Sequence, residues 1–437
     1  MSGHDRIRRW ASWGAGILLV GLLGFGAFAW RPALPAVATP APSSFGSDVV
    51  AHGATLAAAG YCSTCHTVKG GRAFAGGYAM NTGFGTIYST NITPDRDTGI
   101  GTWSKEAFRR AMRAGVSRDG SHLFPAFPYD HFTKLSDADD DAIYAFLMTQ
   151  EPVHAPDQPD ALPFPLGIRA LQAGWKLLFF KAGRFFPAPD KDAQWNRGAY
   201  LAEGLSHCSS CHTPRNLLGA ERSGAARYTG ASIDGWLAPA LTGANPAPAP
   251  WTSAELSTYL FEGISRFHGT PAGPMSPAAH GLNALSPSDR DALVSYIGSL
   301  TQGNERSQAT ATATVKALEA DKTSAGRQTD PDARLYVAAC ASCHYNGSSG
   351  INPSRPDLQT NTVVHLCDPT NLIRVILFGI DAAEGAPELV MPAFASGFSD
   401  ADVARIAGYL RRTRTDQPPW LDLEKKVAAI RAQKNGT

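Results

Sequence analysis

Six of the seven cysteines in this chain fall in three copies of one pentapeptide, Cys-x-x-Cys-His. Two thiols at this spacing can each form a thioether to one porphyrin, and the histidine that follows then lies under the iron as its proximal ligand. The pattern predicts three covalently bound haem c groups, each with its iron. The predicted thioether cysteines are Cys62, Cys65, Cys208, Cys211, Cys340 and Cys343, and the predicted proximal ligands are His66, His212 and His344.

Other uses of paired cysteines fit this sequence less well. A zinc site would need a second pair of cysteines or histidines near each motif, and the sequence has none there. A disulfide framework belongs to small chains with little apolar sequence, whereas 43% of these residues are hydrophobic. The formal net charge of +1 predicts no nucleic-acid partner, because such partners require a strongly basic surface.

The N-terminus combines arginines with an apolar run, which is typical of an exported protein. Arg6, Arg8 and Arg9 precede a stretch from Gly14 to Trp30 that contains no charge. As a helix this stretch is about 25 Å long, close to the thickness of a hydrocarbon core. We expect an uncleaved anchor in the cell inner membrane, with the body of the chain on the periplasmic side. Cleavage after Ala36-Val37-Ala38 would instead release a soluble exported protein.

The same order of elements recurs three times along the body of the chain. Each Cys-x-x-Cys-His motif follows a helix-like stretch, and loops rich in glycine and proline lead from it to a helix that ends near a glycine. Each unit then closes on an amphipathic helix that begins after a serine cap. The first helices are expected at 49–60, 195–204 and 332–339, the middle helices at 104–115, 253–263 and 369–379, and the closing helices after Ser136, Ser286 and Ser399. The repeat predicts a mainly α protein with three domains in tandem after an N-terminal transmembrane anchor.

Longer motifs link these units to a known family. Asn91-Ile92-Thr93-Pro94-Asp95, the Arg118-Asp119-Gly120 turn and the run Asn196–Leu201 resemble those of the triheme cytochrome c subunits of membrane-bound alcohol, aldehyde and gluconate dehydrogenases of acetic acid bacteria. The resemblance covers the chain after the anchor and implies three class I cytochrome c domains. It also implies that the subunit takes electrons from a catalytic partner and passes them to membrane ubiquinone.

The expected domain organisation follows from the repeat and the composition of the segments between its copies. The stretch 162–187 mixes aromatic and basic residues, which is typical of a membrane interface; a linker packed against its neighbours is the alternative. The remaining cysteine, Cys367, is expected to be a buried structural thiol. The expected segments are the anchor and tether (1–43), cytochrome c domain 1 (44–155), an aromatic and basic linker (156–190), domain 2 (191–302), an exposed linker (303–331), domain 3 (332–420) and a C-terminal tail (421–437).

The sixth iron ligand decides whether a haem carries electrons or binds small molecules, because a methionine thioether fills the site and raises the potential. Met275 lies in the loop between the middle and closing helices of the second unit, and Met391 lies at the matching place in the third. A class I domain presents its distal ligand from this loop. Both methionines are therefore predicted distal ligands.

The first unit departs from this pattern. It has Phe127 where the alcohol dehydrogenase subunits that it resembles have methionine, and phenylalanine cannot ligate iron. Met112, on the helix that packs against the distal side of the haem in class I domains, is the predicted replacement. His131, His122 and Met80 are alternatives, and an open sixth position is a further one.

The sequence thus predicts an electron-transfer subunit. The loop Ala126–Phe132 resembles that of cytochrome subunits accompanying molybdopterin and iron–sulfur hydroxylases, so the favoured partners are the molybdopterin large subunit and iron–sulfur small subunit of an aldehyde dehydrogenase. A quinoprotein alcohol dehydrogenase or a flavin gluconate dehydrogenase is the alternative partner. An enzyme with an open first haem, such as a peroxidase, is the alternative from another class, and it would require one high-spin iron.

Overall fold

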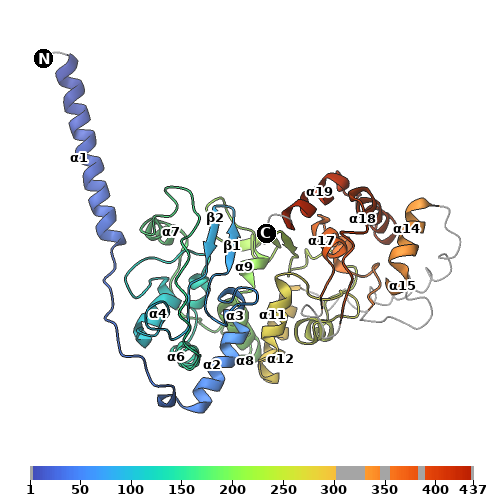
Figure 1. Cartoon of the computed structure of the whole chain (residues 1–437), viewed down its shortest axis with the longest axis horizontal. Helices are drawn as coiled ribbons and strands as arrows, with labels where there is room; N and C mark the ends of the chain where they lie inside the picture. The colour runs from blue at the N-terminus through green and yellow to red at the C-terminus, as the bar shows by residue number, and fades with distance from the viewer. Residues whose placement is uncertain (1–2, 302–329, 345–354, 382–388, 435–437) are drawn as a thin grey trace. The chain divides into compact units, whose positions relative to one another are not determined.

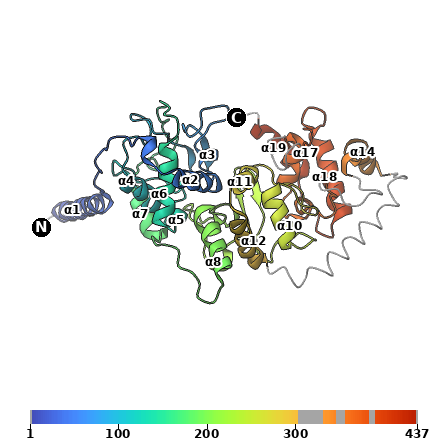
Figure 2. The same cartoon turned by 90° about the horizontal axis from the view of Figure 1, so that it is seen from below.

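The computed structural model describes residues 3–301, 330–344, 355–381 and 389–434. These residues form two compact units, one of Met1–Ala57 and Cys62–Phe185, the other of Ala58–Tyr61 and Phe186–Thr437. Figures 1 and 2 show that the described part of the chain is mainly helical, with small antiparallel hairpins. The mainly α fold predicted from the repeat is therefore confirmed. Most of the expected linker 303–331 lies outside the described residues.

The first unit contains the N-terminal helix, the first cytochrome-like domain and the aromatic and basic segment. Its hairpin pairs Ala79 with Tyr88 and Thr82 with Gly85. The elements in order are α1 (Gly3–Ala29), η1 (Pro42–Ser44), α2 (Ser47–Ala59), α3 (Cys62–Cys65), β1 (Ala79–Thr82), β2 (Gly85–Tyr88), α4 (Lys105–Ala114), α5 (Tyr129–Phe132), α6 (Asp137–Met148) and α7 (Leu171–Phe179).

The second unit contains the other two domains. Its second-domain elements are α8 (Ala193–Tyr200), η2 (Leu201–Leu205), α9 (Ser209–His212), η3 (Gly224–Ala226), β3 (Ala231–Ile233), β4 (Trp236–Ala238), α10 (Ser253–Ser257), η4 (Thr258–Glu262), α11 (Met275–Leu282) and α12 (Pro287–Thr301). Its third-domain elements are α14 (Pro331–Ala339), α15 (Ala341–His344), α16 (Thr362–His365), α17 (Thr370–Phe378), α18 (Asp400–Arg414) and α19 (Leu423–Lys434).

Local side chains begin and end these helices where the sequence indicates. The Ser104 hydroxyl accepts a hydrogen bond from the Ala107 backbone N–H and caps α4, which is the role that serine favours at a helix start. The helix ends at Gly115 in the left-handed conformation, with φ of 60°, where a side chain would be strained. Ser136 caps α6 in the same way, and Ser399 forms a full capping box at α18.

Two glycines let the first and closing helices of a domain cross closely. A Cβ atom at Gly53 on α2 would overlap the carbonyl oxygen of Ala142 on α6, and one at Gly198 on α8 would overlap that of Ala292 on α12. The repeated Gly-Ala-x-Leu run therefore marks a backbone contact that only glycine allows.

Between the helix crossing and the first motif cysteine, the second domain has one residue more than the first domain. Leu56 precedes Cys62 by six positions, whereas Leu201 precedes Cys208 by seven. The extra residue falls where α8 continues into the π-helix η2. A π turn absorbs a single inserted residue without breaking the helix, so the Cys-x-x-Cys-His motif keeps its place after the helix.

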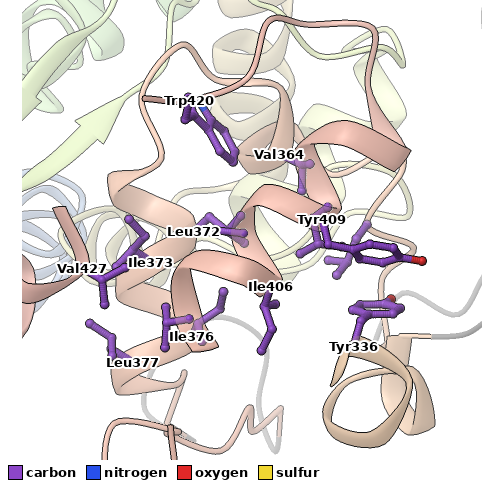
Figure 3. Packing of buried hydrophobic residues seen from close by; sticks show 14 of the residues in the cluster. Tyr336, Val364, Leu372, Ile373, Ile376, Leu377, Ile406, Tyr409, Trp420 and Val427 are labelled. Atoms are coloured by element: carbon purple, nitrogen blue, oxygen red, sulfur yellow. The ribbon is translucent and has the colours of Figure 1, made fainter. Parts of the chain in front are cut away.

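The third domain has a core that extends past residue 420, the end predicted from the sequence. Val427 and Ile430 of α19 are buried against α17 and α18 together with Trp420. Figure 3 shows Val427 beside Ile373 and Leu377, and Tyr336 of α14 beside Tyr409. Residues 423–434 are thus part of the domain and do not form a tail.

The N-terminal helix continues into a tether that packs on the first domain. Within α1, the stretch Ser12–Ala29 is long and apolar enough to cross a membrane, a property that signal sequences share. After it, the Leu34 N–H donates to the Arg118 carbonyl at 2.8 Å, and the Val37 N–H donates to the Thr102 carbonyl at 3.0 Å.

Candidate haem sites

Each Cys-x-x-Cys-His motif forms one helical turn. The histidine backbone N–H donates to the carbonyl of the first cysteine at 3.0 Å for His66, 3.1 Å for His212 and 2.9 Å for His344. Residues i, i+3 and i+4 share one face of a helix. Both thiols and the imidazole of each motif therefore start from the same face of their turn.

A backbone carbonyl orients each of the three imidazoles. Nδ1 of His66 lies 2.7 Å from the Thr90 oxygen, and Nδ1 of His212 lies 2.7 Å from the Pro239 oxygen. For His344 the acceptor is the Pro356 oxygen at 3.0 Å. Because a carbonyl only accepts, Nδ1 carries the proton in each ring and Nε2 keeps its lone pair. A metal-ligating histidine is held in this way by its second ring nitrogen.

Burial favours the neutral forms of the motif side chains. It lowers the pKa of His66, His212 and His344, with the carbonyl hydrogen bond acting in the opposite direction, so the neutral imidazole is favoured. Burial is also the main cause that raises the pKa of Cys62 and Cys208 to about 12 and of Cys340 to about 11. All six motif cysteines are free of disulfides, so these residues fit covalent haem c.

The three carbonyl acceptors were not predicted from the sequence. They follow their histidines by 24, 27 and 12 residues, and the acceptor is a threonine in one domain and a proline in the others. The sequence holds one feature that two of these acceptors share: Pro239 and Pro356 are each followed two residues later by a leucine.

The predicted distal ligands of the second and third domains lie between the middle and closing helices. Met275 is half-buried and begins α11. Met391 is held by two backbone hydrogen bonds of 2.9 Å to Ile380, the residue that follows the helix-ending Gly379. Their roles as iron ligands stay predictions.

The candidates in the first domain occupy different environments. Met112 is 5% exposed on α4, whereas Met80 is half-buried on β1 and pairs with Ile87. Phe127 packs against Phe132, with ring centroids 5.4 Å apart. The role of Met112 as the iron ligand of this domain stays a prediction.

The two histidines considered as alternative ligands, His122 and His131, are both buried. Nε2 of His122 lies 2.8 Å from the Ala29 carbonyl oxygen, and its Nδ1 lies 3.0 Å from the Lys176 amine. Both ring nitrogens of His122 are thus engaged, which leaves none for iron in this arrangement. His131 lies on α5, with Nε2 4.0 Å from the Asp130 carboxylate.

The expectation of a buried thiol at Cys367 was wrong, because this residue is exposed. It lies between α16 and α17, two residues after His365. Its neighbours His365 and Leu366 are the buried residues of this turn, so packing there does not require the thiol.

The fold and these sites define a c-type cytochrome with domains in tandem. The sequence family described as Cytochrome c matches residues 50–151 and 196–301. The family described as Cytochrome C oxidase, cbb3-type, subunit III matches residues 327–410. Cytochrome c domains bind haem c covalently, with its iron.

Three relatives extend the similarity over most of the chain. A nicotinate dehydrogenase subunit of Pseudomonas putida is 44% identical over 93% of this chain, which spans 34% of that protein. The fructose dehydrogenase cytochrome subunit of Gluconobacter japonicus is 37% identical over 85% of this chain and 80% of its own length. The gluconate 2-dehydrogenase cytochrome c subunit of Pantoea cypripedii is 36% identical over 88% of this chain and 89% of its own length. The chain belongs to the family of cytochrome c subunits of fructose, gluconate and alcohol dehydrogenases.

Proposed function

We propose that this chain holds three haem c groups and passes electrons from the catalytic subunits of a dehydrogenase to ubiquinone in the membrane. The observation that carries the proposal is the threefold repeat of one arrangement: a helical turn with two cysteines outside any disulfide and an imidazole whose Nδ1 is fixed by a carbonyl. Haem c supplies reversible one-electron exchange at its iron. Three such sites suit a relay, because electrons can then pass through the chain in steps.

The protein's own residues keep each site in one geometry. The carbonyls of Thr90, Pro239 and Pro356 hold the imidazoles in one tautomer and make them better ligands. Met275, Met391 and Met112 would hold the iron on the side opposite the imidazole in the second, third and first domains, and small molecules would then be kept from it.

The proposed location is the periplasmic side of the cell inner membrane, with α1 retained as an anchor. The support is the packing of the N-terminal segment on the first domain. Cleavage after Ala38 would remove Leu34 and Val37, which bond to Arg118 and Thr102, and Ala29, which bonds to His122. Intact mass of the purified chain tests retention: an N-terminus at Thr39 would contradict it.

The favoured partners are a molybdopterin large subunit and an iron–sulfur small subunit that oxidise an aldehyde. The support is the loop Ala126–Phe132, which resembles that of cytochrome subunits serving such enzymes. A second candidate substrate is nicotinate, since one relative at 44% identity is a nicotinate dehydrogenase subunit. This chain supplies the electron acceptor in either case.

The experiment is to purify the full chain with its co-purifying subunits and to add aldehydes, nicotinate, alcohols, gluconate and fructose in turn. One substrate class should reduce the c-type haem absorption, and reoxidation should follow addition of a ubiquinone analogue. Mass spectrometry of the co-purifying subunits identifies the catalytic cofactors. Failure of every substrate to reduce the haem of a complete complex would contradict the relay.

A further inference from the structure

The helix α7 presents apolar side chains outward and its lysine inward. Leu177 is 71% exposed and Leu178 is 67% exposed. Lys176, between them and Trp175, instead points its amine at the first domain, where Nζ lies 2.7 Å from the Ala114 oxygen and 2.6 Å from the Gly115 oxygen. A helix on a water-exposed surface has the opposite arrangement.

The apolar surface continues along the segment that leads into this helix. Phe164 is 88% exposed, Ile168 44% and Leu171 38%. Monomeric soluble proteins rarely expose large apolar patches, and such patches mark a partner or a membrane. Residues 164–178 are called the α7 patch below.

The α7 patch lies beside the end of the apolar N-terminal helix. Elements α1 and α7 are in contact, and Figure 1 shows α7 next to the end of α1 that leads into the first domain. A Cβ atom at Gly174 of α7 would lie 3.6 Å from the Phe25 ring of α1. The two apolar helices therefore adjoin at Gly174 and Phe25.

The position of this contact along α1 fixes how far α7 would lie below the membrane surface. Phe25 precedes Trp30 by five residues, which is about 7.5 Å along a helix. Arg31 donates to the carbonyls of Phe28 and Trp30, which places a guanidinium at the end of the apolar helix α1. Helices that lie in a membrane interface bury their apolar face by about 5–10 Å, which matches the level of Gly174.

We propose that the α7 patch lies in the periplasmic interface of the lipid bilayer, next to the point where α1 leaves it. The proposal rests on the proposed role of α1 as a retained anchor. The first domain is then held against the membrane by two elements, and Lys176 with its carbonyl acceptors fixes the patch to that domain. A lipid surface is the occupant, because the patch adjoins the helix that crosses the bilayer.

Photolabelling with lipids tests the proposal on the full chain and its co-purifying subunits in vesicles of phosphatidylethanolamine and phosphatidylglycerol. Two phospholipid probes are used, with a diazirine near the carboxyl end or at the far end of one acyl chain. The shallow probe should label residues 164–178 and the region of Phe25. The deep probe should label only α1, around Leu18 and Leu22. A peptide containing Leu217, which is 96% exposed in the second unit, should be labelled by neither.

A variant and its control separate docking from anchoring. Leu177→Glu with Leu178→Glu should abolish labelling of the α7 patch and leave that of α1 unchanged, whereas Leu217→Glu should change neither. Labelling of α1 without the α7 patch in the unmutated complex would overturn the docking and keep the anchor. Labelling of the patch in the isolated chain but not in the complex would show that a partner subunit covers it, which also overturns the proposal. Absence of labelling in α1 would instead refute the anchor.

Discussion

Nε2 of His122 donates a hydrogen bond of 2.8 Å to the carbonyl oxygen of Ala29, the last residue of α1 and 93 positions earlier in the chain. Nδ1 of the same ring accepts from the Lys176 amine at 3.0 Å. The buried side chain of His122, in the loop after α4, thus connects this loop to the N-terminal helix and to helix α7. A residue considered as an iron ligand from the sequence has a structural role in this arrangement.

Replacing Lys176 tests this connection. Lys176→Met keeps the apolar stem and removes the donor to His122, Ala114 and Gly115, so buried acceptors lose their partner. Each such loss costs about 1–3 kcal/mol. The midpoint of thermal unfolding of the full chain in detergent should fall clearly. Lys181→Met, at an exposed position of the same segment, should leave the midpoint nearly unchanged, and an equal effect of both changes would contradict the connection.

The effect of Lys176→Met on the unfolding midpoint should also depend on pH. Burial lowers the pKa of Lys176 to about 7, whereas an unfolded lysine has a pKa of about 10.4. Between these values the unfolded chain binds more protons, so the native protein becomes more stable as pH rises. Lys176→Met lacks this gain. The difference in unfolding midpoint between the two proteins should therefore widen from about pH 7 to about pH 9; a constant difference would show that the amine keeps an ordinary pKa.

The glycine crossing of the second domain predicts a matched pair of substitutions. Gly198→Ala places a Cβ against the Ala292 carbonyl, and a Cβ at this position would also lie 2.8 Å from Cβ of Tyr296. The helices would have to separate, at a cost of about 1–3 kcal/mol or more. Gly298→Ala on α12 meets only Leu256 at 3.8 Å and should stabilise the helix by about 0.5–1 kcal/mol. Unfolding midpoints that move in the same direction would contradict the crossing.

Local patterns in the sequence predicted the elements but not the contacts between them. The serine caps, the helix-ending glycines and the threefold order of helices follow from residues close in sequence, and the structure confirms helices at these places. The close crossing of α8 and α12 brings Gly198 against Ala292, 94 positions away, and no local pattern predicts that contact. Helix α19 was missed because its buried Val427 and Ile430 stand among charged residues, which weakens the apolar stripe of so short a helix.

At the haem sites, too, local features could be predicted from the sequence and long-range contacts could not. The Cys-x-x-Cys-His motif identifies thiols and imidazole within five residues, so the chemistry could be predicted from the sequence. The carbonyls of Thr90, Pro239 and Pro356 come from loops, and a backbone oxygen has no residue-specific signature. For the same reason, the engagement of both His122 nitrogens could not be foreseen.

The number of haem groups is directly measurable. Mass analysis of the denatured chain together with a pyridine haemochrome assay should give three covalently bound haems. His212→Ala should disturb one iron site and leave the other two spectra intact, because the three histidines belong to separate helical turns. Cys367→Ser is the control and should keep all three haems with unchanged spectra. A count of two or fewer in the unmutated protein would refute the central proposal.

The first domain offers the sharpest test, because Phe127 leaves its sixth position to another residue. Met112→Leu keeps the volume and hydrophobicity of a buried side chain and removes the sulfur, so the loss of folding stability should stay under about 1.5 kcal/mol. If Met112 is the ligand, one haem of three becomes high-spin and binds carbon monoxide. Met148→Leu, at a position 1% exposed on α6 of the same domain, should leave three low-spin haems.

The remaining outcomes assign the site by elimination. Three low-spin haems in Met112→Leu, with a high-spin haem in His131→Ala, would make His131 the ligand. A high-spin haem that binds carbon monoxide in the unmutated protein would mean that no side chain ligates this iron. The first domain would then have the open position that peroxidase chemistry requires, and turnover of hydrogen peroxide by the purified chain would become the decisive measurement.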